Sequence, residues 1–139
     1  MKVREFRLRD YVEVSDLWEK SSFGTSRGDG LGEIRRKLKR DPELFLVAEE
    51  DGRVVGSVLG AWDGRRGWLY HLGVLPEYKR KGVATRLVQE VERRMRRKGV
   101  LKVNAVVYNR NRASFAFFKR LGYQADKSMT FHGKVLRED

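Results

Sequence analysis

The hydrophobic pattern changes its period twice between residues 68 and 108, and this restricts the fold more than any other feature. Residues 68–74 alternate like a strand, residues 83–98 repeat apolar side chains at helical spacing, and residues 101–108 form a second apolar run. A strand, a helix and a strand in this order form a βαβ unit with parallel strands and a right-handed crossover. We therefore expect a sheet that is at least partly parallel.

The residues before this unit predict an antiparallel meander. Residues 44–50 and 53–62 have the composition of strands, and Asp51-Gly52 between them favours a tight hairpin turn. A second turn at Asp63-Gly64 leads into the strand at 68–74. The central sheet is thus expected to be mixed.

Further elements are expected towards both ends of the chain. They are a strand over 2–8, a helix from a capping Asp10 to Lys20, a Ser- and Gly-rich loop over 21–30, a helix over 31–40, a helix capped by Asn109 or Asn111, and a strand from Tyr123 to Val135. The fold class is α+β, with helices on both faces of the sheet. We expect residues 1–139 to form a single domain.

Composition excludes several kinds of chemistry. The chain has no cysteine, so thiolate nucleophiles, disulfides and Cys-based metal sites are excluded. It has only two histidines, His71 and His132, and we expect no metal. No apolar run approaches the ~20 residues of a membrane span, and the first residues lack the apolar core of a signal peptide. We expect a cytoplasmic protein that does not enter a membrane.

The net charge of +12 has two interpretations. A surplus of cations attracts nucleic acids, phosphorylated cofactors and acidic protein surfaces. A solvated, charge-rich surface is the simpler interpretation. The Arg-rich helix over 86–98 is the segment that would contact nucleic acid.

The segment from Leu72 to Thr85 carries the strongest functional signal. A strand ends, a short basic turn follows, and a helix begins, so free backbone N–H groups at the helix start can bind an anion. Gly82 and the small Ala84 allow a phosphate to approach the backbone closely. Lys79, Arg80 and Lys81 add positive charge, and Thr85 adds a hydroxyl. A basic turn without a ligand is the alternative.

Two motifs resemble those of a known family. The run from Leu72 to Tyr78, followed by Lys79-x-x-Gly82-x-Ala84, is similar to the acyl-CoA-binding motif Gln/Arg-x-x-Gly-x-Gly/Ala of the GNAT superfamily of N-acetyltransferases. The segment from Asn111 to Tyr123 resembles its second signature, a capped helix that ends in Leu-Gly-Tyr or Leu-Gly-Phe. The resemblance covers nearly the whole chain and is to small, single-domain bacterial and archaeal members.

The resemblance implies an acetyl-CoA-dependent N-acetyltransferase. Acetyl-CoA would lie in a V-shaped gap where strand 68–74 splays from strand 101–108, with its pyrophosphate on the amides from Arg80 to Thr85. The amide of Val74 would polarise the thioester carbonyl, and an amine would attack directly in a ternary complex without a metal. The implied cofactor-binding residues are Leu72, Gly73, Val74, Lys79, Arg80, Lys81, Gly82, Val83, Ala84, Thr85, Asn111 and Phe118. Asn111 would contact the pantetheine arm or cap the last helix.

The catalytic residues are less clearly indicated. Phe118 stands where many relatives carry a Tyr whose hydroxyl protonates the departing thiolate, so Tyr108 or water would take that role. His71 would be the general base, because imidazole groups titrate near pH ~6.5. Simple packing against the sheet is the alternative for His71. Asp29 and Glu33 would help to bind the amine, or are ordinary charges at the start of a helix.

Two other functions stay open on the sequence. One is a GNAT-fold module that binds acyl-CoA without turnover, and the other is a basic domain associated with nucleic acid. The partners expected for the enzyme are acetyl-CoA and an unidentified amine of a small molecule or a protein. A homodimer is a further expectation, since this fold often pairs through its sheet edges or C-terminal strands.

Overall fold

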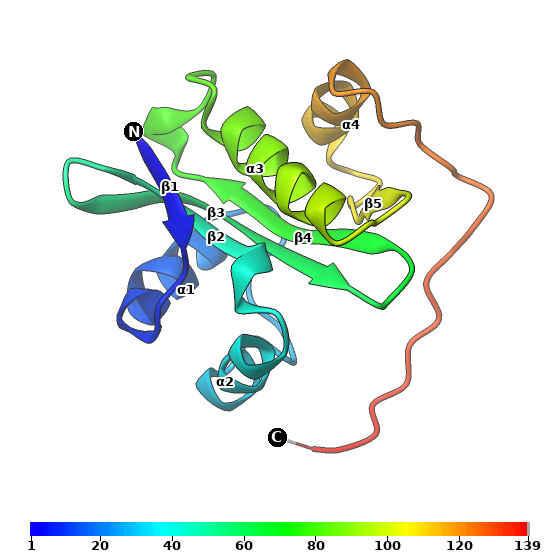
Figure 1. Ribbon diagram of the computed structural model, residues 1–139, viewed down its shortest axis with the longest axis horizontal. Helices are drawn as coiled ribbons and strands as arrows, with labels where there is room; N and C mark the ends of the chain where they lie inside the picture. Colours follow the sequence, from blue (N-terminus) through cyan, green and yellow to red (C-terminus); the bar gives the residue numbers. More distant parts are fainter. Residues whose placement is uncertain (139) are drawn as a thin grey trace.

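A mixed five-stranded sheet forms the centre of the protein (Figure 1). The computed structural model describes residues 1–138. The strands are β1 (Lys2–Glu5), β2 (Phe45–Glu50), β3 (Arg53–Trp62), β4 (Gly67–Val74) and β5 (Val103–Ala105), and they lie in this order across the sheet. Strands β1 to β4 pair antiparallel, whereas β5 is parallel to β4. The predicted meander, mixed sheet and parallel pair are confirmed.

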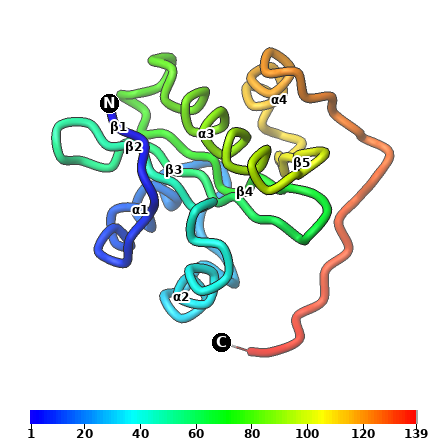
Figure 2. Tube along the Cα trace, viewed as in Figure 1, coloured from blue at the N-terminus to red at the C-terminus, as the bar shows by residue number. Residues whose placement is uncertain are grey.

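Helices cover both faces of this sheet, as expected (Figures 1 and 2). They are α1 (Tyr11–Glu19), α2 (Leu31–Arg40), α3 (Val83–Arg97) and α4 (Arg112–Arg120), with short 3-10 turns η1 (Leu8–Asp10), η2 (Pro42–Leu44) and η3 (Pro76–Tyr78). Helix α3 covers one face, α1 covers the other, and α4 lies beside α3 next to β5. Within residues 1–138, no helix combines the length and apolar character that a membrane span requires.

The apolar stripe of α3 forms a large part of the core. Val83, Leu87, Val88, Val91 and Met95 are all at most 4% exposed. Glycines of the sheet allow this helix to lie close: a Cβ added at Gly60 would be 2.7 Å from the Leu44 carbonyl and 3.1 Å from a Val91 methyl. Burying one such apolar side chain contributes ~1.5–3 kcal/mol, so the stripe fixes α3 on β3 and β4.

One extra residue interrupts β4. The pairing with β3 is regular as far as Tyr70 and resumes at Gly73, and two residues, His71 and Leu72, take the place of one between them. His71 has a φ of +50°, in the left-handed region. This is a β-bulge, and it reverses the alternation of side chains in the rest of the strand.

The N-terminal prediction needs a correction. The first strand ends at Glu5 rather than at residue 8, and the Asp10 side chain does not cap α1. Its carboxylate instead accepts two hydrogen bonds from the Arg4 guanidinium, at 2.8 and 2.9 Å, and one from the Arg7 amide at 2.8 Å. A charged donor outcompetes a helix amide, so the cap prediction for Asp10 is wrong.

The C-terminal prediction is also wrong. Residues 123–138 form no strand and run along the outside of the molecule, past α4 and β5 and then towards α2 (Figure 2). The apolar side chains of Met129, Phe131 and Leu136 are 71–90% exposed, so their alternation is matched by no sheet partner. The expected strand over 101–108 is likewise reduced to β5, Val103–Ala105.

Candidate active site

Strands β4 and β5 diverge soon after they meet, as the V-shaped gap requires. They pair only from Gly67 to Leu69 of β4, and the last link is the hydrogen bond that the Val106 amide donates to the Leu69 carbonyl at 3.0 Å. Beyond this point lies a cavity of about 200 Å³. It is lined by β4 from Leu69 to Leu72, by residues 106–108, by the start of α4, and by Ser22 and Phe23.

The bulge decides which amides of β4 face this gap. Leu69 directs its carbonyl towards β5, whereas Leu75, six residues on, donates its amide to Val55 of β3 at 2.9 Å. In a regular strand these two residues would face the same edge, so the extra residue has exchanged the edges. The amides of Leu72 and Val74 therefore point into the gap, where the resemblance places the thioester and the pantetheine.

The segment from Lys79 to Thr85 lies beyond the end of β4. The first amide of α3 with an intrahelical partner is that of Arg86, which donates to the Gly82 carbonyl at 3.1 Å. The helix start has no side-chain cap and no acidic residue in its first turn. Gly82 has a φ of +81°, and no atom lies within 4 Å of a Cβ added there. The amides of Val83, Ala84 and Thr85 are thus available to an anion.

His71 lies on the α1 face of the sheet. Its ring is stacked on Phe23, with 4.7 Å between ring centroids, and meets Trp18 edge-on at 4.8 Å. Its Nε2 is 3.0 Å from both carboxylate oxygens of Asp29. The ring also lines the cavity, so packing and a place in the site are both realised.

Asp29 is a residue whose place the sequence did not predict. We considered it as an amine ligand or as a charge at a helix start, but its side chain is 8% exposed and binds His71, 42 residues away. It also accepts a hydrogen bond from the Ser26 amide at 2.9 Å. The other candidate of that loop, Glu33, forms an ion pair with Arg137 outside the cavity. No local sequence pattern predicts a contact between a loop and a strand that are so distant in sequence.

Three further predicted residues surround the same cavity. Tyr108, 50% exposed, lies beyond the end of β5 rather than on a strand. Asn111 caps α4 by accepting the Ser114 amide at 3.2 Å, and its Nδ2 donates to the Ser22 hydroxyl at 3.2 Å. Phe118 is 8% exposed and lines the cavity. The structure therefore brings Tyr108, Asn111 and Phe118 together with His71.

The basic residues of α3 are largely engaged within the protein. Hydrogen bonds from Arg93 hold the pKa of Glu90 at about 2, and Arg94 binds the same carboxylate at 2.8 Å. Lys98 forms an ion pair with Glu43 at 2.5 Å. Much of the positive charge of the helix expected to contact nucleic acid is thus paired with carboxylates of the protein itself.

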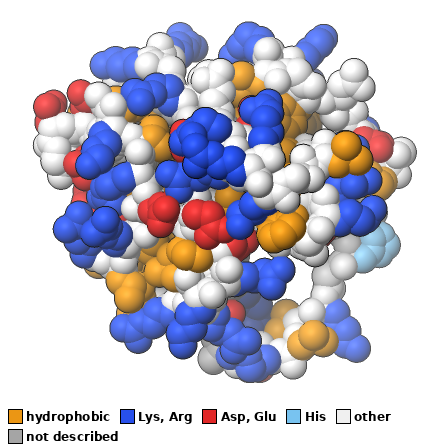
Figure 3. Space-filling model, viewed as in Figure 1, with side chains coloured by type: hydrophobic (Ala, Val, Ile, Leu, Met, Phe, Trp, Pro, Cys, Tyr) orange, Lys and Arg blue, Asp and Glu red, His pale blue; other side chains and the backbone are white. Residues whose placement is uncertain are grey.

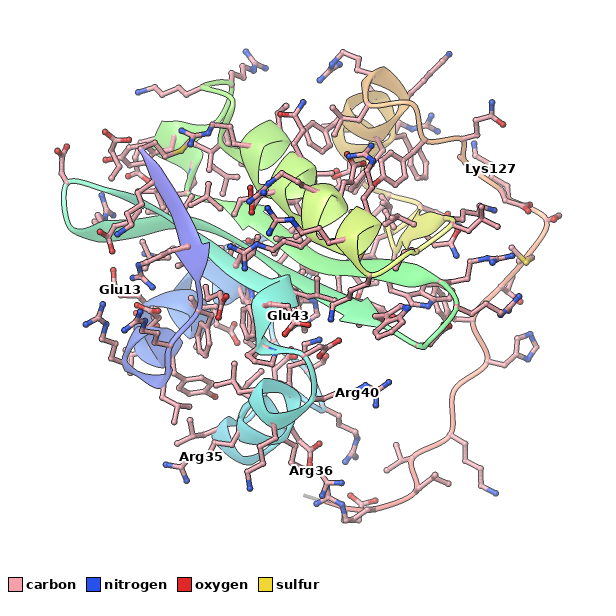
Figure 4. All side chains as sticks on the ribbon, in the orientation of Figure 1. Glu13, Arg35, Arg36, Arg40, Glu43 and Lys127 are labelled. Carbon is pink, nitrogen blue, oxygen red and sulfur yellow. The ribbon has the colours of Figure 1, made fainter. Side chains whose placement is uncertain are left out.

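Other cations are spread over the surface. Figure 3 shows Lys and Arg side chains on most parts of the viewed face, with a group below, over α2. In Figure 4, Arg35 and Arg36 extend from α2 away from the sheet, and Glu43 lies near the end of α3. The Arg40 guanidinium instead donates to the Trp62 carbonyl at the end of β3, at 3.0 Å. This distribution is typical of a solvated, charge-rich surface. Residues 1–138 contain no group of three or more His, Asp or Glu side chains arranged to hold a metal ion.

The sequence resembles that of known proteins over its full length. Residues 6–123 match the model of the acetyltransferase (GNAT) family. An acetyltransferase from Sodalis glossinidius is 41% identical over 139 residues, which cover 100% of this chain and 98% of that protein.

Solved structures share the fold. The PaiA N-acetyltransferase from Thermoplasma acidophilum, in complex with coenzyme A, has a TM-score of 0.82 at 20% identity and covers 92% of each chain. An aminoglycoside antibiotic 6′-N-acetyltransferase from Acinetobacter haemolyticus has a TM-score of 0.79 at 22% identity, over 99% of this chain and 100% of that chain. The fold implied by the two sequence motifs is thereby confirmed.

Proposed function

The chain belongs to the acetyltransferase (GNAT) family and is an acetyl-CoA-dependent N-acetyltransferase, and from this premise we propose which residues bind the substrates and carry the transfer. The observation that carries the proposal is the divergence of β4 and β5 after Leu69, beside a helix start without a side-chain cap. The gap exposes strand amides and the helix exposes terminal amides. A thioester with a diphosphate tail needs both kinds of donor.

Acetyl-CoA binds along the edge of β4 and over the start of α3. The pantetheine pairs with the main chain of Leu72 and Val74 as an added strand would. The pyrophosphate rests on the free backbone amides at the start of α3, the last of which is that of Thr85. The exposed side chains of Lys79, Arg80 and Lys81 add positive charge. No acidic side chain lies in the first turn of α3 to oppose an anion.

The amine attacks the thioester carbonyl directly. His71 takes a proton from the ammonium group, and the freed nitrogen lone pair forms the new C–N bond. The amide of Val74 donates to the carbonyl oxygen as negative charge develops there. When the C–S bond breaks, the thiolate takes a proton from Tyr108 or from water, because Phe118 has no proton to give. The nitrogen then releases its second proton to the group that gave one to the thiolate, which leaves a neutral amide.

The activity is tested by titrating the protein with acetyl-CoA in a calorimeter and then measuring thiol release with a panel of amines. Saturable binding together with thiol release on at least one amine is the expected result. Binding without turnover on any amine would instead indicate an acyl-CoA-binding module. Failure to bind CoA, with DNA binding that weakens steeply with salt, would indicate a nucleic-acid-associated domain.

The binding residues are tested at Gly82. Gly82→Val moves the amides of the helix start, and because a hydrogen bond to a charged group contributes ~1.5–3 kcal/mol, losing two raises the Kd of acetyl-CoA at least ~100-fold. Gly99→Val is a matched control: Gly99 follows the same helix, has the same φ of +81°, and has no atom within 4 Å of an added Cβ. Both variants carry the same backbone strain, ~1–2 kcal/mol. Equal acetyl-CoA affinity in the two variants would remove the helix start from the binding site.

Two further expectations belong to this proposal. A cytoplasmic location suits an enzyme that depends on acetyl-CoA. A homodimer is tested by light scattering at several protein concentrations, where a mass near the 16.3 kDa of one chain would contradict it.

A further inference from the structure

His71 of β4 and Asp29 of the loop over 21–30 are in close contact. Among the residues described, they form the only pair of titratable side chains that links this strand to this loop. The Nε2 atom lies 3.0 Å from Oδ1 and 3.0 Å from Oδ2, so the ring faces the carboxylate squarely. Asp29 is 8% exposed and His71 is 21% exposed. The carboxylate is therefore inside the protein, whereas the ring reaches the cavity.

The carboxylate is held from its own side. Its Oδ2 accepts the Ser26 amide at 2.9 Å, and the backbone of Asp29 donates to the Ser26 carbonyl at 3.1 Å, which closes a tight turn. Tyr11 of α1 donates its hydroxyl to the Asp29 carbonyl at 3.0 Å. The turn is thereby attached to α1, and the carboxylate has a fixed direction towards the ring.

The ring is held as well. Phe23 lies parallel to it, with an angle of 14° between the planes, and Trp18 meets it at 75°. The left-handed backbone at His71, with a φ of +50°, is a conformation that persists only where the surroundings impose it. Imidazole position and plane are thus set by three elements: α1, the loop and β4.

This geometry determines the tautomer of the ring. An ionised carboxylate only accepts hydrogen bonds, so a neutral imidazole that faces it through Nε2 carries its proton on Nε2. The lone pair then lies on Nδ1, for which residues 1–138 provide no hydrogen-bond partner. We propose that Asp29 is a positioning residue, which keeps His71 in the Nε2–H tautomer so that Nδ1 accepts the proton of the acceptor ammonium.

This inference rests on the proposed function, because it assigns a proton acceptor for the amine. The ammonium N–H bond breaks and the Nδ1–H bond forms. The nitrogen lone pair then forms the C–N bond, the C–S bond breaks and releases the CoA thiolate as described above, and the imidazolium later gives its proton to water. The positive charge on the ring is stabilised by the adjacent carboxylate. Asp29 is the only charged group in contact with the ring among the described residues; Trp18 and Phe23 are neutral, and the tyrosines that share the cavity are Tyr70 and Tyr108.

The tautomer is measured directly by nitrogen NMR of the ring. The chain has two histidines, and His132 lies in the exposed C-terminal segment, so His132→Gln assigns the two sets of signals and leaves activity unchanged. The wild-type protein is expected to show His71 in the Nε2–H form. In Asp29→Asn the amide group can donate to Nε2, which moves the ring proton to Nδ1 in a large share of the molecules.

The kinetic effects follow from the same change. Asp29→Asn lowers kcat ~100-fold, the lower end of what a general base contributes, and leaves the KM for acetyl-CoA unchanged. Asp29→Glu, which restores the carboxylate, recovers most of the activity and the Nε2–H signal.

Two results would overturn the inference: a wild-type His71 in the Nδ1–H form, or an Asp29→Asn variant with wild-type kcat. Loss of folding in Asp29→Asn is detected by its melting temperature, and the wild-type spectrum then decides alone. If the wild-type enzyme turns over no amine although His71 is in the Nε2–H form, the proposed function fails while the tautomer assignment stands.

Discussion

Gly56 and Gly73 are in adjacent strands of the sheet, but their missing side chains would point to opposite layers. A Cβ at Gly73 would lie 2.7 Å from a Leu17 methyl and 2.8 Å from the Ser21 hydroxyl, where α1 leads into the loop over 21–30. A Cβ at Gly56 would lie 2.8 Å from a Val83 methyl, at the start of α3. Alanine at each position therefore disturbs one half of the proposed site and spares the other.

The expected magnitudes follow from these distances. Contacts below 3.0 Å force neighbouring atoms to move, and such overpacking destabilises a protein by ~1–3 kcal/mol. Replacing glycine within a strand returns ~0.5–1 kcal/mol, so each variant loses at most ~2.5 kcal/mol of unfolding free energy. For a chain of 139 residues this corresponds to a melting temperature lower by at most about 9 °C.

The two variants differ in function rather than in stability. Gly56→Ala displaces the helix start and raises the Kd of acetyl-CoA about tenfold, a change of ~1.4 kcal/mol measured by calorimetry. Gly73→Ala shifts the ring signals of His71 in the NMR spectrum, because Phe23 and the loop move, and changes that Kd less than about twofold. Equal loss of acetyl-CoA affinity in both variants, or a shifted His71 only in Gly56→Ala, would refute the division of the site between two faces.

Two other substitutions test stability and catalysis. Burial alone would raise the pKa of Asp10, but hydrogen bonds from the Arg4 side chain and the Arg7 amide hold this pKa below its ordinary value of 3.8. The ionised carboxylate therefore stabilises the folded protein above pH 3.8, and this stabilisation is lost as the pH falls through the lowered pKa. Asp10→Asn is expected to lower the unfolding free energy at pH 7 by ~3 kcal/mol and to flatten the loss of stability below pH 4 in urea titrations; an unchanged acid limb would contradict this. Phe118→Tyr places a hydroxyl in the cavity and is expected to raise kcat severalfold without changing the KM for acetyl-CoA, whereas an unchanged kcat would show that Tyr108 or water already supplies the proton.

The parts of the fold that were predictable depend on local patterns. Asp51 and Gly52 both adopt positive φ angles, +53° and +74°, as a two-residue hairpin turn requires, so the turn could be recognised from two residues. The helical period over 83–98 predicted α3 to within one residue at its end. The helix start at Gly82 was predictable for the same reason, because a strand, a basic turn and a helix follow one another directly in the chain.

The parts that were not predictable depend on contacts between distant residues. Arg4 takes the Asp10 carboxylate away from the helix it was expected to cap, which no helix rule includes. The alternating run from Met129 to Val135 has the pattern of a strand, yet a strand forms only where another offers its edge, and β5 offers three residues. The contact between Asp29 and His71 arises because a loop closes over the sheet, and neither residue has a neighbour in sequence that indicates it.

The bulge in β4 explains how one strand serves both substrates. Gly67 faces Met95 of α3, so regular alternation would put residue 71 on that same face, inside the core and away from the loop over 21–30. Regular alternation would also turn the amides of Leu72 and Val74 towards β3, where they could not reach a thioester in the gap. A single extra residue corrects both directions at once, because side-chain face and amide edge each change with every residue. Deleting Leu72 would leave His71 opposite Val58 in a regular ladder and turn its side chain to the α3 face, whereas Val74 would stay opposite Gly56 with its amide in the gap. We therefore expect this deletion to remove the base and to keep the oxyanion donor, and a deletion variant with wild-type kcat would contradict the role of the bulge.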